Sequence, residues 1–438
     1  MRFPQQFLPA ARSLPIAVVG IGQGRADDDH SFHRQGYSLI SETTSKDHST
    51  NTCTSTGRTG DAATLATALT TTRVRTLGLI AAWAQARPAL DAPQQPEFNL
   101  PLWELGHIGW FAEWWITRNQ QRSLGVACDP FHTRSASRFA FTDALYDSSA
   151  VAHATRWQLP LPRLDATLNY LEAVQSDSLR LLRDAGSTDD ALYFWRLVLF
   201  HEAMHNEAAV YMAQSLGLAL APSLVRGHPE SHRSCSADQI DIPTQSWMLG
   251  SPPGGFVFDN EVGPHPVALQ RFSIDATAVS WARYLPFLEA TGHPLPPHLR
   301  RGSGEAGTTD PWQQWFFGMW QPLNPAAPAV HLSCADAESW CRWAGRRLPT
   351  EAEWECAALQ SPSRFQWGEV WEWTASTFEP YPGFTTHPYV DYSAPWFGNR
   401  RVLRGACAAT SVDMLNARYR NFFTPDRHDI FAGFRSVG

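Results

Sequence analysis

Two kinds of sequence pattern divide this chain, and the division limits the folds open to it. Up to about residue 222, apolar residues recur at spacings of three and four, as on the buried face of a helix. From about residue 246, short apolar runs alternate with Gly, Pro and Asn. A chain of 438 residues exceeds one ordinary hydrophobic core. We therefore predict a helical domain over 61–222, a linker over 223–245 and a loop-rich α+β domain over 246–438.

The helical part contains four long periodic segments with one long connection, which is the pattern of a four-helix bundle. We expect Gly186 to end the third helix, Asp189 or Asp190 to stand near the start of the fourth, and Gly217 to follow it. The second segment, LWELGHIGWFAEWWITRN, is strongly aromatic. Residues 1–60 show neither period, are rich in Ser, Thr, Asp and Gly, and are expected to form a disordered extension.

Composition excludes several classes of protein. A formal charge of −7 argues against a nucleic-acid surface. No apolar run reaches the roughly 18 residues that span a membrane, and the N-terminus lacks the pattern of a signal peptide. The seven cysteines are scattered and contain no CxxC pair, which favours reduced thiols and a cytoplasmic location.

The segment FHEAMH in the fourth helix is the strongest indication of chemistry. His201 and His205 are four residues apart and share one helical face. His107 lies in a second apolar helix, GHIGWF, where an uncoordinated imidazole would need another partner. Three histidines from two helices would hold one metal ion and leave positions open for substrate and oxygen. Two bundle histidines without a ligand role are the plainer alternative.

The five residues from His201 to His205, HEAMH, also match HExxH, in which Glu202 would be the general base of a zinc protease. The longer protease signature requires Gly and His where this chain has Ala208 and Tyr211, and Glu230 follows the expected helix end. A protease is therefore a minor alternative, as is a metal-binding scaffold without catalysis. The chain has neither a GxSxG nor a GxxxxGK motif.

The motifs GHIGWF and HEAMHNE resemble the iron-binding, DinB-like bundle of ergothioneine-type sulfoxide synthases. The second half resembles the formylglycine-generating-enzyme or sulfatase-modifying fold, which is C-type-lectin-like, through GRRLPTEAEWE, GEVWEWTAS, RVLRGACA and RYRNFFTPDRHDIFAGFRS. Together these stretches cover nearly all of 61–438. The second fold alone could indicate a formylglycine-generating enzyme. That chemistry needs two cysteines where this chain has Ser411 and Asn416, with Cys407 alone nearby.

The resemblance implies iron(II) held by His107, His201 and His205, and bond formation between a sulfur or selenium donor and C2 of the hercynine imidazole. It implies Tyr381 as a proton donor and Asn421 as a substrate contact, in a site between the two domains. Further implied substrate-binding residues are Phe423, Met204, Phe384, Arg420 and Arg156.

Three departures from the family pattern concern the donor. Phe423 stands where an Asp commonly binds the amine of γ-glutamylcysteine, Met204 replaces a Gln, and Arg156 and Arg163 remain from an arginine-rich loop with altered spacing. A charged donor needs charged partners. The pattern resembles the selenoneine synthases and favours a neutral selenosugar, with an ergothioneine synthase that uses a thiol as the alternative. The expected partners are these small molecules and dioxygen, with no nucleic acid, membrane or obligate protein partner.

Overall fold

The computed structural model describes residues 56–225, 235–302 and 312–438. Most of the expected disordered extension, and Glu230, lie outside these ranges. Among the residues described, no helix combines the length and apolar content that crossing a bilayer requires.

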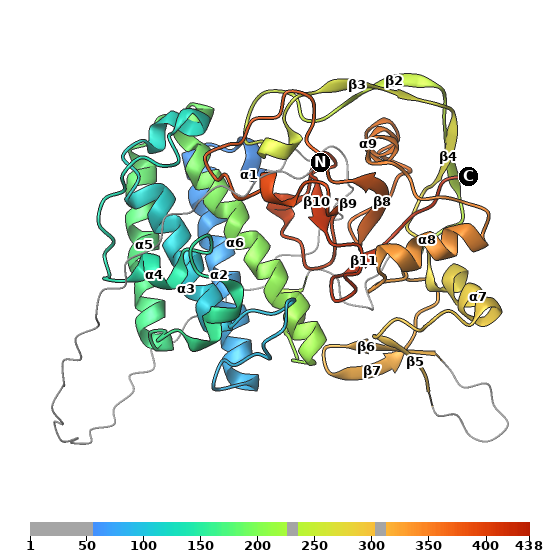
Figure 1. Cartoon of the computed structure of the whole chain (residues 1–438), viewed down its shortest axis with the longest axis horizontal. Coiled ribbons are helices and arrows are strands. Elements are labelled where there is room, and N and C mark those ends of the chain that lie inside the picture. The colour runs from blue at the N-terminus through green and yellow to red at the C-terminus, as the bar shows by residue number, and fades with distance from the viewer. Residues whose placement is uncertain (1–55, 226–234, 303–311) are drawn as a thin grey trace, which may run out of the picture. The chain divides into compact units, whose positions relative to one another are not determined.

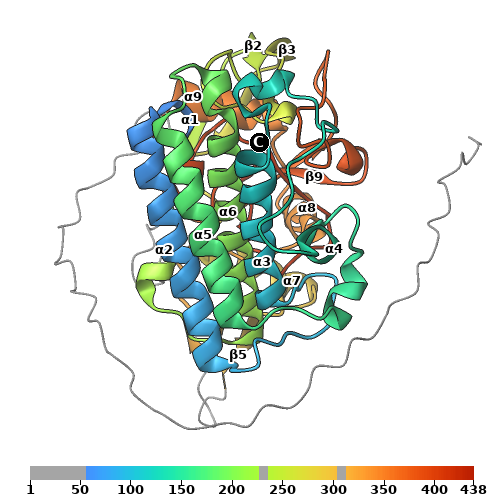
Figure 2. The same cartoon turned by 90° about the vertical axis from the view of Figure 1, so that its left-hand side faces the viewer.

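Four long helices pack side by side in the N-terminal part, which we call the helical region (Figure 2). They are α2 (Ala62–Ala86), α3 (Pro101–Ala112), α5 (Leu164–Arg183) and α6 (Asp189–Leu216). The helix α3 continues into a π-helical turn over Glu113–Thr117. Shorter helices are α1 (Thr56–Thr59) and α4 (Thr142–Tyr146), with 3-10 turns at Arg122–Ala127, His153–Gln158 and Pro222–Leu224.

The helix ends confirm part of the predicted capping. Gly217 ends α6 in the left-handed conformation, with φ 68°, as expected of a glycine after a helix. Asp189 and Asp190 stand in the first turn of α6, as predicted, and the Thr188 side chain caps this helix by accepting from the backbone N–H of Ala191. The prediction for Gly186 was wrong: α5 ends at Arg183 with Asp184 as its cap.

The C-terminal region, residues 235–438, combines small sheets with three α-helices among its described residues (Figure 1). Its largest sheet has the order β10-β9-β8-β11, with only β11 parallel to its neighbour. The strands of this sheet are β8 (Trp371–Thr377), β9 (Arg401–Gly405), β10 (Asn421–Phe423) and β11 (Ala432–Gly433). The antiparallel sets are β1 (Gln239–Ile242) with β4 (Phe272–Asp275), β2 (Gln245–Leu249) with β3 (His265–Leu269), and β5 (Leu299–Arg301), β6 (Trp312–Phe316) and β7 (Met319–Pro322).

Side-chain caps start two of the three helices in this region. The segment CADAESWCRWAG forms α8 (Cys334–Trp343), and Ser333 and Asp336 form a capping box at its start. The following α9 (Glu351–Gln360) starts with a capping box of Thr350 and Glu353. The remaining helix is α7 (Trp281–Thr291).

Two predicted boundaries were displaced. The helix α1 lies inside the extension expected to be disordered up to residue 60, because Arg58 makes a buried, bidentate ion pair with Glu261. The strand β1 lies inside the expected linker, because Gln239–Ile242 pairs with β4. Interactions with distant residues order both segments, so their own composition did not reveal them.

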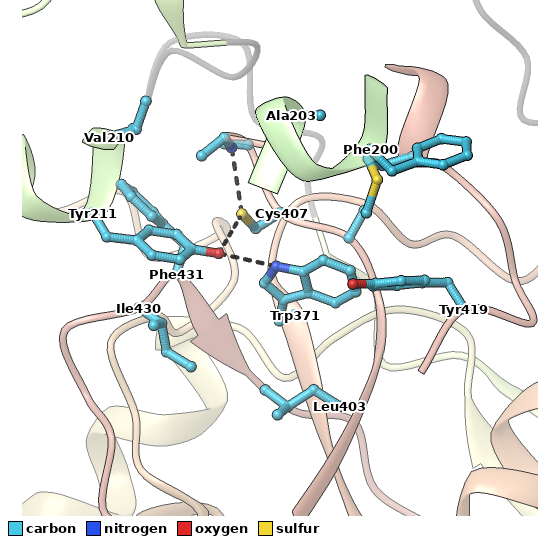
Figure 3. Packing of buried hydrophobic residues seen from close by; sticks show 14 of the residues in the cluster. Phe200, Ala203, Val210, Tyr211, Trp371, Leu403, Cys407, Tyr419, Ile430 and Phe431 are labelled. Carbon is cyan, nitrogen blue, oxygen red and sulfur yellow. Dashed lines mark hydrogen bonds between the residues drawn. The ribbon is translucent and has the colours of Figure 1, made fainter. Parts of the chain in front are cut away.

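The helix α6 packs directly on the C-terminal region, and one hydrophobic core includes residues of both (Figure 3). The indole N–H of Trp371 donates to Glu207 at 2.7 Å and to the Tyr211 hydroxyl at 3.0 Å. Gln214 donates to the backbone carbonyl of Trp315 and accepts from the N–H of Phe317. These contacts hold one face of α6 against β8 and the loop between β6 and β7.

A buried ionic cluster stabilises the C-terminal region. Glu351 forms ion pairs with Arg404 at 2.8 Å and with Arg420 at 2.9 Å, and Glu355 also pairs with Arg404, at 3.1 Å. Burial by itself raises the pKa of Glu351, but Arg420 and Arg404 outweigh it and lower that pKa. Glu351 is therefore ionised, and its charge depends on the two arginines.

We expect Glu351→Gln to destabilise the protein by about 3–5 kcal/mol, because it leaves buried arginines without their counter-charge. Urea denaturation followed by tryptophan fluorescence measures the change. The control is Glu338→Gln, since Glu338 pairs with Arg401 and Arg342 near the surface and such pairs contribute about 0–1 kcal/mol. Equal loss of stability in both variants would contradict the role given to the buried cluster.

Candidate metal centre

Three histidine side chains from α3 and α6 converge inside the helical region. His107, His201 and His205 each offer a ring nitrogen, and these atoms all lie within 4.8 Å of one another. The Nε2 atom of His201 is 3.2 Å from that of His107 and 3.1 Å from that of His205. His107 and His201 are buried and His205 is partly buried. The structure thus brings together the three residues predicted as ligands.

The opposite ring nitrogen of two of these histidines is held by an acceptor. Nδ1 of His107 donates to the backbone carbonyl of Tyr146 at 2.8 Å, and Nδ1 of His205 donates to the carboxylate of Glu104. A carbonyl or carboxylate oxygen can only accept, so the hydrogen of each neutral ring stays on Nδ1. The Nε2 lone pairs are then free to bind a metal, as is usual for histidine ligands with an orienting partner.

A glycine permits one of these orienting contacts. A Cβ atom at Gly106 would lie 2.2 Å from the Tyr146 ring, so only glycine fits between α3 and α4 there. The close approach brings the Tyr146 carbonyl within reach of the next residue, His107. The GH pair in the sequence therefore has a structural reason.

The electrostatics favour neutral ligand rings. Burial, together with the nearby His205, lowers the pKa of His107 to about 3, and burial lowers the pKa of His201 well below its ordinary value. Burial would raise the pKa of Glu104, but its contact with His205 outweighs this and holds that pKa at about 2. His107 and His201 are thus neutral imidazoles, which is the protonation state that metal binding requires of a histidine.

The spacing of the Nε2 atoms fits a shared metal ion. Two nitrogen ligands about 2.1 Å from a metal and at right angles to each other lie about 3.0 Å apart. The observed 3.1 and 3.2 Å are close to this value. Three protein ligands leave further coordination positions for exogenous molecules.

Glu202 is not placed to act as the general base of a zinc protease. Its carboxylate accepts from Nε and Nη2 of Arg73, at 2.7 and 2.9 Å, and from the Thr76 hydroxyl at 2.6 Å. It is 2% exposed, and these partners on α2 satisfy both of its oxygens. The HExxH match therefore combines two metal-site histidines with a structural ion pair, and the protease alternative loses its catalytic residue.

Tyr389, which sequence analysis missed, lies beside the histidines. Its ring is 5.0 Å from the Phe111 ring and 6.3 Å from that of His201, and Phe111 itself stacks on His201 at 3.5 Å. Among the described residues, the Tyr389 hydroxyl makes no hydrogen bond. The signal in the sequence was only an aromatic pair, YVDY, in an irregular stretch, and nothing local linked that stretch to α6.

Met204 faces a pair of tyrosines from the C-terminal region. Its sulfur is 3.6 Å from the Tyr419 hydroxyl and 3.9 Å from that of Tyr392, and the two hydroxyls are 3.0 Å apart. Tyr392 also neighbours Tyr389, with ring centres 5.9 Å apart. The predicted residue Met204 therefore lies where the C-terminal loops approach the metal-site helix.

Arg156 lies beside the second ligand helix. Its guanidinium stacks over the Trp103 ring at 3.7 Å and donates to Asn99 at 2.9 Å. Trp103 in turn stacks on His107 at 4.8 Å. Arg156 is 8% exposed, its Nε has no partner, and no carboxylate of the described residues forms an ion pair with it. Arg163, in contrast, is exposed at the start of α5.

Asn421 and Phe423 lie on the same face of β10, since residues two apart in a strand share a face. The guanidinium of Arg427 lies over the Phe423 ring, 5.0 Å from the ring centre, and Arg427 is also paired with Asp429. The carbonyl of the Asn421 side chain accepts from its neighbour Phe422. Both predicted residues are half-buried.

Tyr381 and Arg420 are not brought together with the histidines. The Tyr381 hydroxyl donates to Glu351 and accepts from Arg404, both at 3.1 Å, and its ring packs on His265 in a second hydrophobic core. Arg420 is fully buried in the pair with Glu351. The structure thus assigns both side chains to the ionic cluster, where the charged groups satisfy them.

Among the described contacts of Phe384, none is with the three histidines. Its ring meets that of Phe397 at 5.0 Å. The YPGF segment, on which the expectations for Tyr381 and Phe384 rested, is therefore a structural turn, and the neighbouring YVDY segment approaches the histidines in its place.

Cys407 is buried against α6 and lacks the setting of a reactive thiol. Its sulfur is 3.5 Å from the Tyr211 hydroxyl, and burial raises its pKa to about 12. Ser411 starts a short 3-10 turn, and the Asn416 side chain accepts from the backbone of Arg418. The prediction that the cysteine chemistry of a formylglycine-generating enzyme is missing agrees with these contacts.

Comparison with known proteins connects both halves of the chain to one group. The sulfatase-modifying factor enzyme 1-like domain matches residues 228–369 and 365–438, so the C-terminal region carries a formylglycine-generating-enzyme-like domain. A hercynine oxygenase from Mycolicibacterium smegmatis is 30% identical over 441 residues, covering 85% of this chain and 98% of that protein. A match of that extent cannot be confined to the C-terminal region.

Other similarities cover about half of the chain. A formylglycine-generating enzyme from Streptomyces coelicolor is 28% identical over 287 residues, covering 47% of this chain and 91% of that protein. The solved structure of PvdO from Pseudomonas aeruginosa covers 48% of this chain and 98% of its own, at 19% identity and a TM-score of 0.33.

We expect Glu104→Gln to weaken binding of a divalent metal by about 10–100-fold, because the amide no longer orients His205 as a charged acceptor. Titration with Co²⁺ under anaerobic conditions, followed by its visible absorption, measures the affinity. The matched control is Glu113→Gln. Glu113 is a buried glutamate on the same helical segment as Glu104, and it accepts hydrogen bonds from Tyr170 and Ser137. Unchanged affinity in Glu104→Gln would show that the carboxylate does not support the site.

Proposed function

Because the chain belongs to the hercynine oxygenase family, and is thus an enzyme of oxygen-dependent oxidation, we propose that it is an iron(II) enzyme acting on hercynine. It bonds the selenium or sulfur atom of a donor to C2 of the hercynine imidazole. The observation that carries this proposal is the convergence of His107, His201 and His205 beside Tyr389, a residue of the C-terminal region.

The proposed architecture has two domains, with the catalytic site formed by both. Residues 61–222 form a DinB-like iron-binding bundle, and 246–438 form the formylglycine-generating-enzyme-like domain after the linker of 223–245. The packing of α2, α3, α5 and α6 supports the first domain. The contacts of Met204 with Tyr392 and Tyr419 support a site to which the second domain contributes.

The three Nε2 atoms would hold the iron, and Glu104 and the Tyr146 carbonyl would keep two of the rings in place. Iron(II), when bound, supplies the redox chemistry that activation of dioxygen requires. Neutral nitrogen ligands leave the positive charge of the ion uncompensated, so it favours anionic ligands such as a selenolate or thiolate. The protein surrounds these positions with aromatic rings, among them Phe111 and Tyr389, and limits the access of water.

Tyr389 takes the role of proton donor that sequence analysis gave to Tyr381. Burial raises the pKa of Tyr389 above its ordinary value, so the phenol keeps its proton at neutral pH. A protonated hydroxyl without a partner among the described residues can donate to a substrate or to reduced oxygen. Its position against Phe111 and His201 supports this role.

Hercynine carries a trimethylammonium group and a carboxylate, and the surroundings of the histidines suit both. Aromatic faces attract quaternary ammonium ions, and Tyr389 and Tyr392 offer such faces. The buried Arg156 lacks an anionic partner among the described residues and suits a carboxylate. Asn421, on β10, is a further contact for the betaine.

For the donor we propose a neutral selenosugar. Phe423 covers an arginine that is already paired with Asp429, and Met204 contributes a thioether, so neither offers an ionic partner to a charged donor. Leaving a buried ammonium group unpaired costs several kcal/mol. A sugar can bind through its hydroxyls and stack an apolar face on an aromatic ring.

The second candidate is an ergothioneine-type sulfoxide synthase that uses a thiol such as γ-glutamylcysteine. The observation in its favour is Arg156, which forms no ion pair among the described residues and suits a carboxylate of such a donor as well as that of hercynine.

Anaerobic reconstitution with iron(II) and hercynine tests the proposal. Seleno-glucose and γ-glutamylcysteine are offered at equal concentration, oxygen is admitted, and products are identified by mass spectrometry. We expect a C–Se product in excess, and no product from His201→Ala. A clear excess of the γ-glutamylcysteine product would reject the selenosugar and keep the hercynine assignment. Absence of both products, with iron bound, would reject the proposed reaction.

We expect Tyr389→Phe to retain iron and hercynine affinity but to alter the oxidative outcome, because Phe has no proton to donate. The measurement is the product ratio per oxygen consumed. Tyr381→Phe is the matched control, since that hydroxyl serves the ionic cluster, and it should lower stability rather than change the product. A wild-type product ratio in Tyr389→Phe would make Tyr389 a packing residue.

A further inference from the structure

A small apolar cavity, partly open to solvent, lies beside His205 in the helical region. It lies between α2, α3 and α6 and has a volume of about 40 Å³. A buried water needs about 10–15 Å³ by the same measure, so the cavity has room for a few small molecules. Its walls include Leu79, Ile80, Leu105, Ile108, Ala209 and Met212.

The polar groups in the wall offer little to hold water. Glu104 is bound by His205 and Asn99, Thr76 by Glu202, and the Asn206 side-chain amide donates to a backbone carbonyl. The indole N–H of Trp83 is buried without a partner among the described residues. A buried water takes about 2–4 hydrogen bonds, whereas apolar cavities stay dry and bind apolar atoms such as xenon. The cavity therefore suits a small apolar molecule.

One histidine of the metal centre, His205, lines the cavity. His205 and Glu104 are both part of its wall. With about 100° between successive residues of a helix, the cavity residues His205, Ala209 and Met212 cluster on one face of α6. Met204 and Tyr211, which contact the C-terminal region, lie on another. The cavity thus reaches His205 from a different side of α6 than the C-terminal tyrosines.

We propose that this cavity holds dioxygen and delivers it to the metal centre. The proposal rests on the proposed function, in which hercynine and the donor occupy the side facing the C-terminal region. With that side filled by polar substrates, an apolar gas needs a separate approach, and the cavity provides it along the His205 ring. Ala209 is the wall residue at which the approach can be narrowed without touching a ligand.

The test uses the full chain with iron(II) bound. Ala209→Leu adds three carbon atoms to the wall, and Ala66→Leu, at a partly buried position of α2 outside the cavity, is the matched control. Xenon occupancy is read from anomalous scattering of pressurised crystals. Dioxygen access is read from the rate of oxidation of bound iron(II) without substrate, and from the KM for dioxygen during turnover.

We expect xenon in the cavity of the wild type and of Ala66→Leu, and none in Ala209→Leu. We expect Ala209→Leu to slow iron(II) oxidation and to raise the KM for dioxygen severalfold, with iron content and the KM for hercynine unchanged. If Ala209→Leu does not fold, competitive inhibition of the wild type by xenon against dioxygen replaces it.

Absence of xenon from the wild-type cavity overturns the proposal. An Ala209→Leu variant that excludes xenon but oxidises iron(II) at the wild-type rate also overturns it. Non-competitive inhibition by xenon against dioxygen has the same consequence. Failure of the proposed function would look different: the protein would bind no iron or would not convert hercynine, and xenon occupancy would still report on the cavity.

Discussion

The rotation of α6 about its own axis is set by buried polar contacts on two sides, and the metal centre depends on it. On the side of α2, Glu202 is held by Arg73 and Thr76. On the side of the C-terminal region, Glu207 and Tyr211 bond to the indole of Trp371. A small rotation would leave buried charges and donors unsatisfied, at a cost of about 1–3 kcal/mol for each neutral group and more for each charge. His201 and His205 therefore point in one defined direction.

The remaining parts of the site follow from that direction. The third ligand, His107, is brought in by α3, which lies close to α4 because Gly106 has no side chain. Glu104, one turn before His107, orients His205 on the other helix. Each histidine thus depends on groups from a neighbouring element, which is how a set of imidazoles can be preorganised before a metal binds.

The C-terminal region separates its structural role from its contribution to the site. Its buried carboxylates and arginines, among them Arg420, bind one another, and the Tyr381 hydroxyl bonds to the same cluster. The irregular stretch that carries Tyr389 and Tyr392 is instead placed against α3 and α6, with Tyr389 beside the histidines. Catalytic diversity in such a domain can arise from loops supported by an ionic core that stays the same.

The sequence alone determined the four long helices and the three histidines that converge, because periodicity and the i, i+4 spacing are local properties. It did not determine which tyrosine meets the histidines. Tyr381 and Tyr389 are eight residues apart in one loop-rich stretch. Their roles differ only because their partners elsewhere in the fold differ. Tyr381 bonds to Glu351 and Arg404, whereas Tyr389 lies against Phe111 and His201. The tertiary structure likewise ordered Arg58 and β1, since an ion pair or a strand partner far along the chain leaves no local pattern.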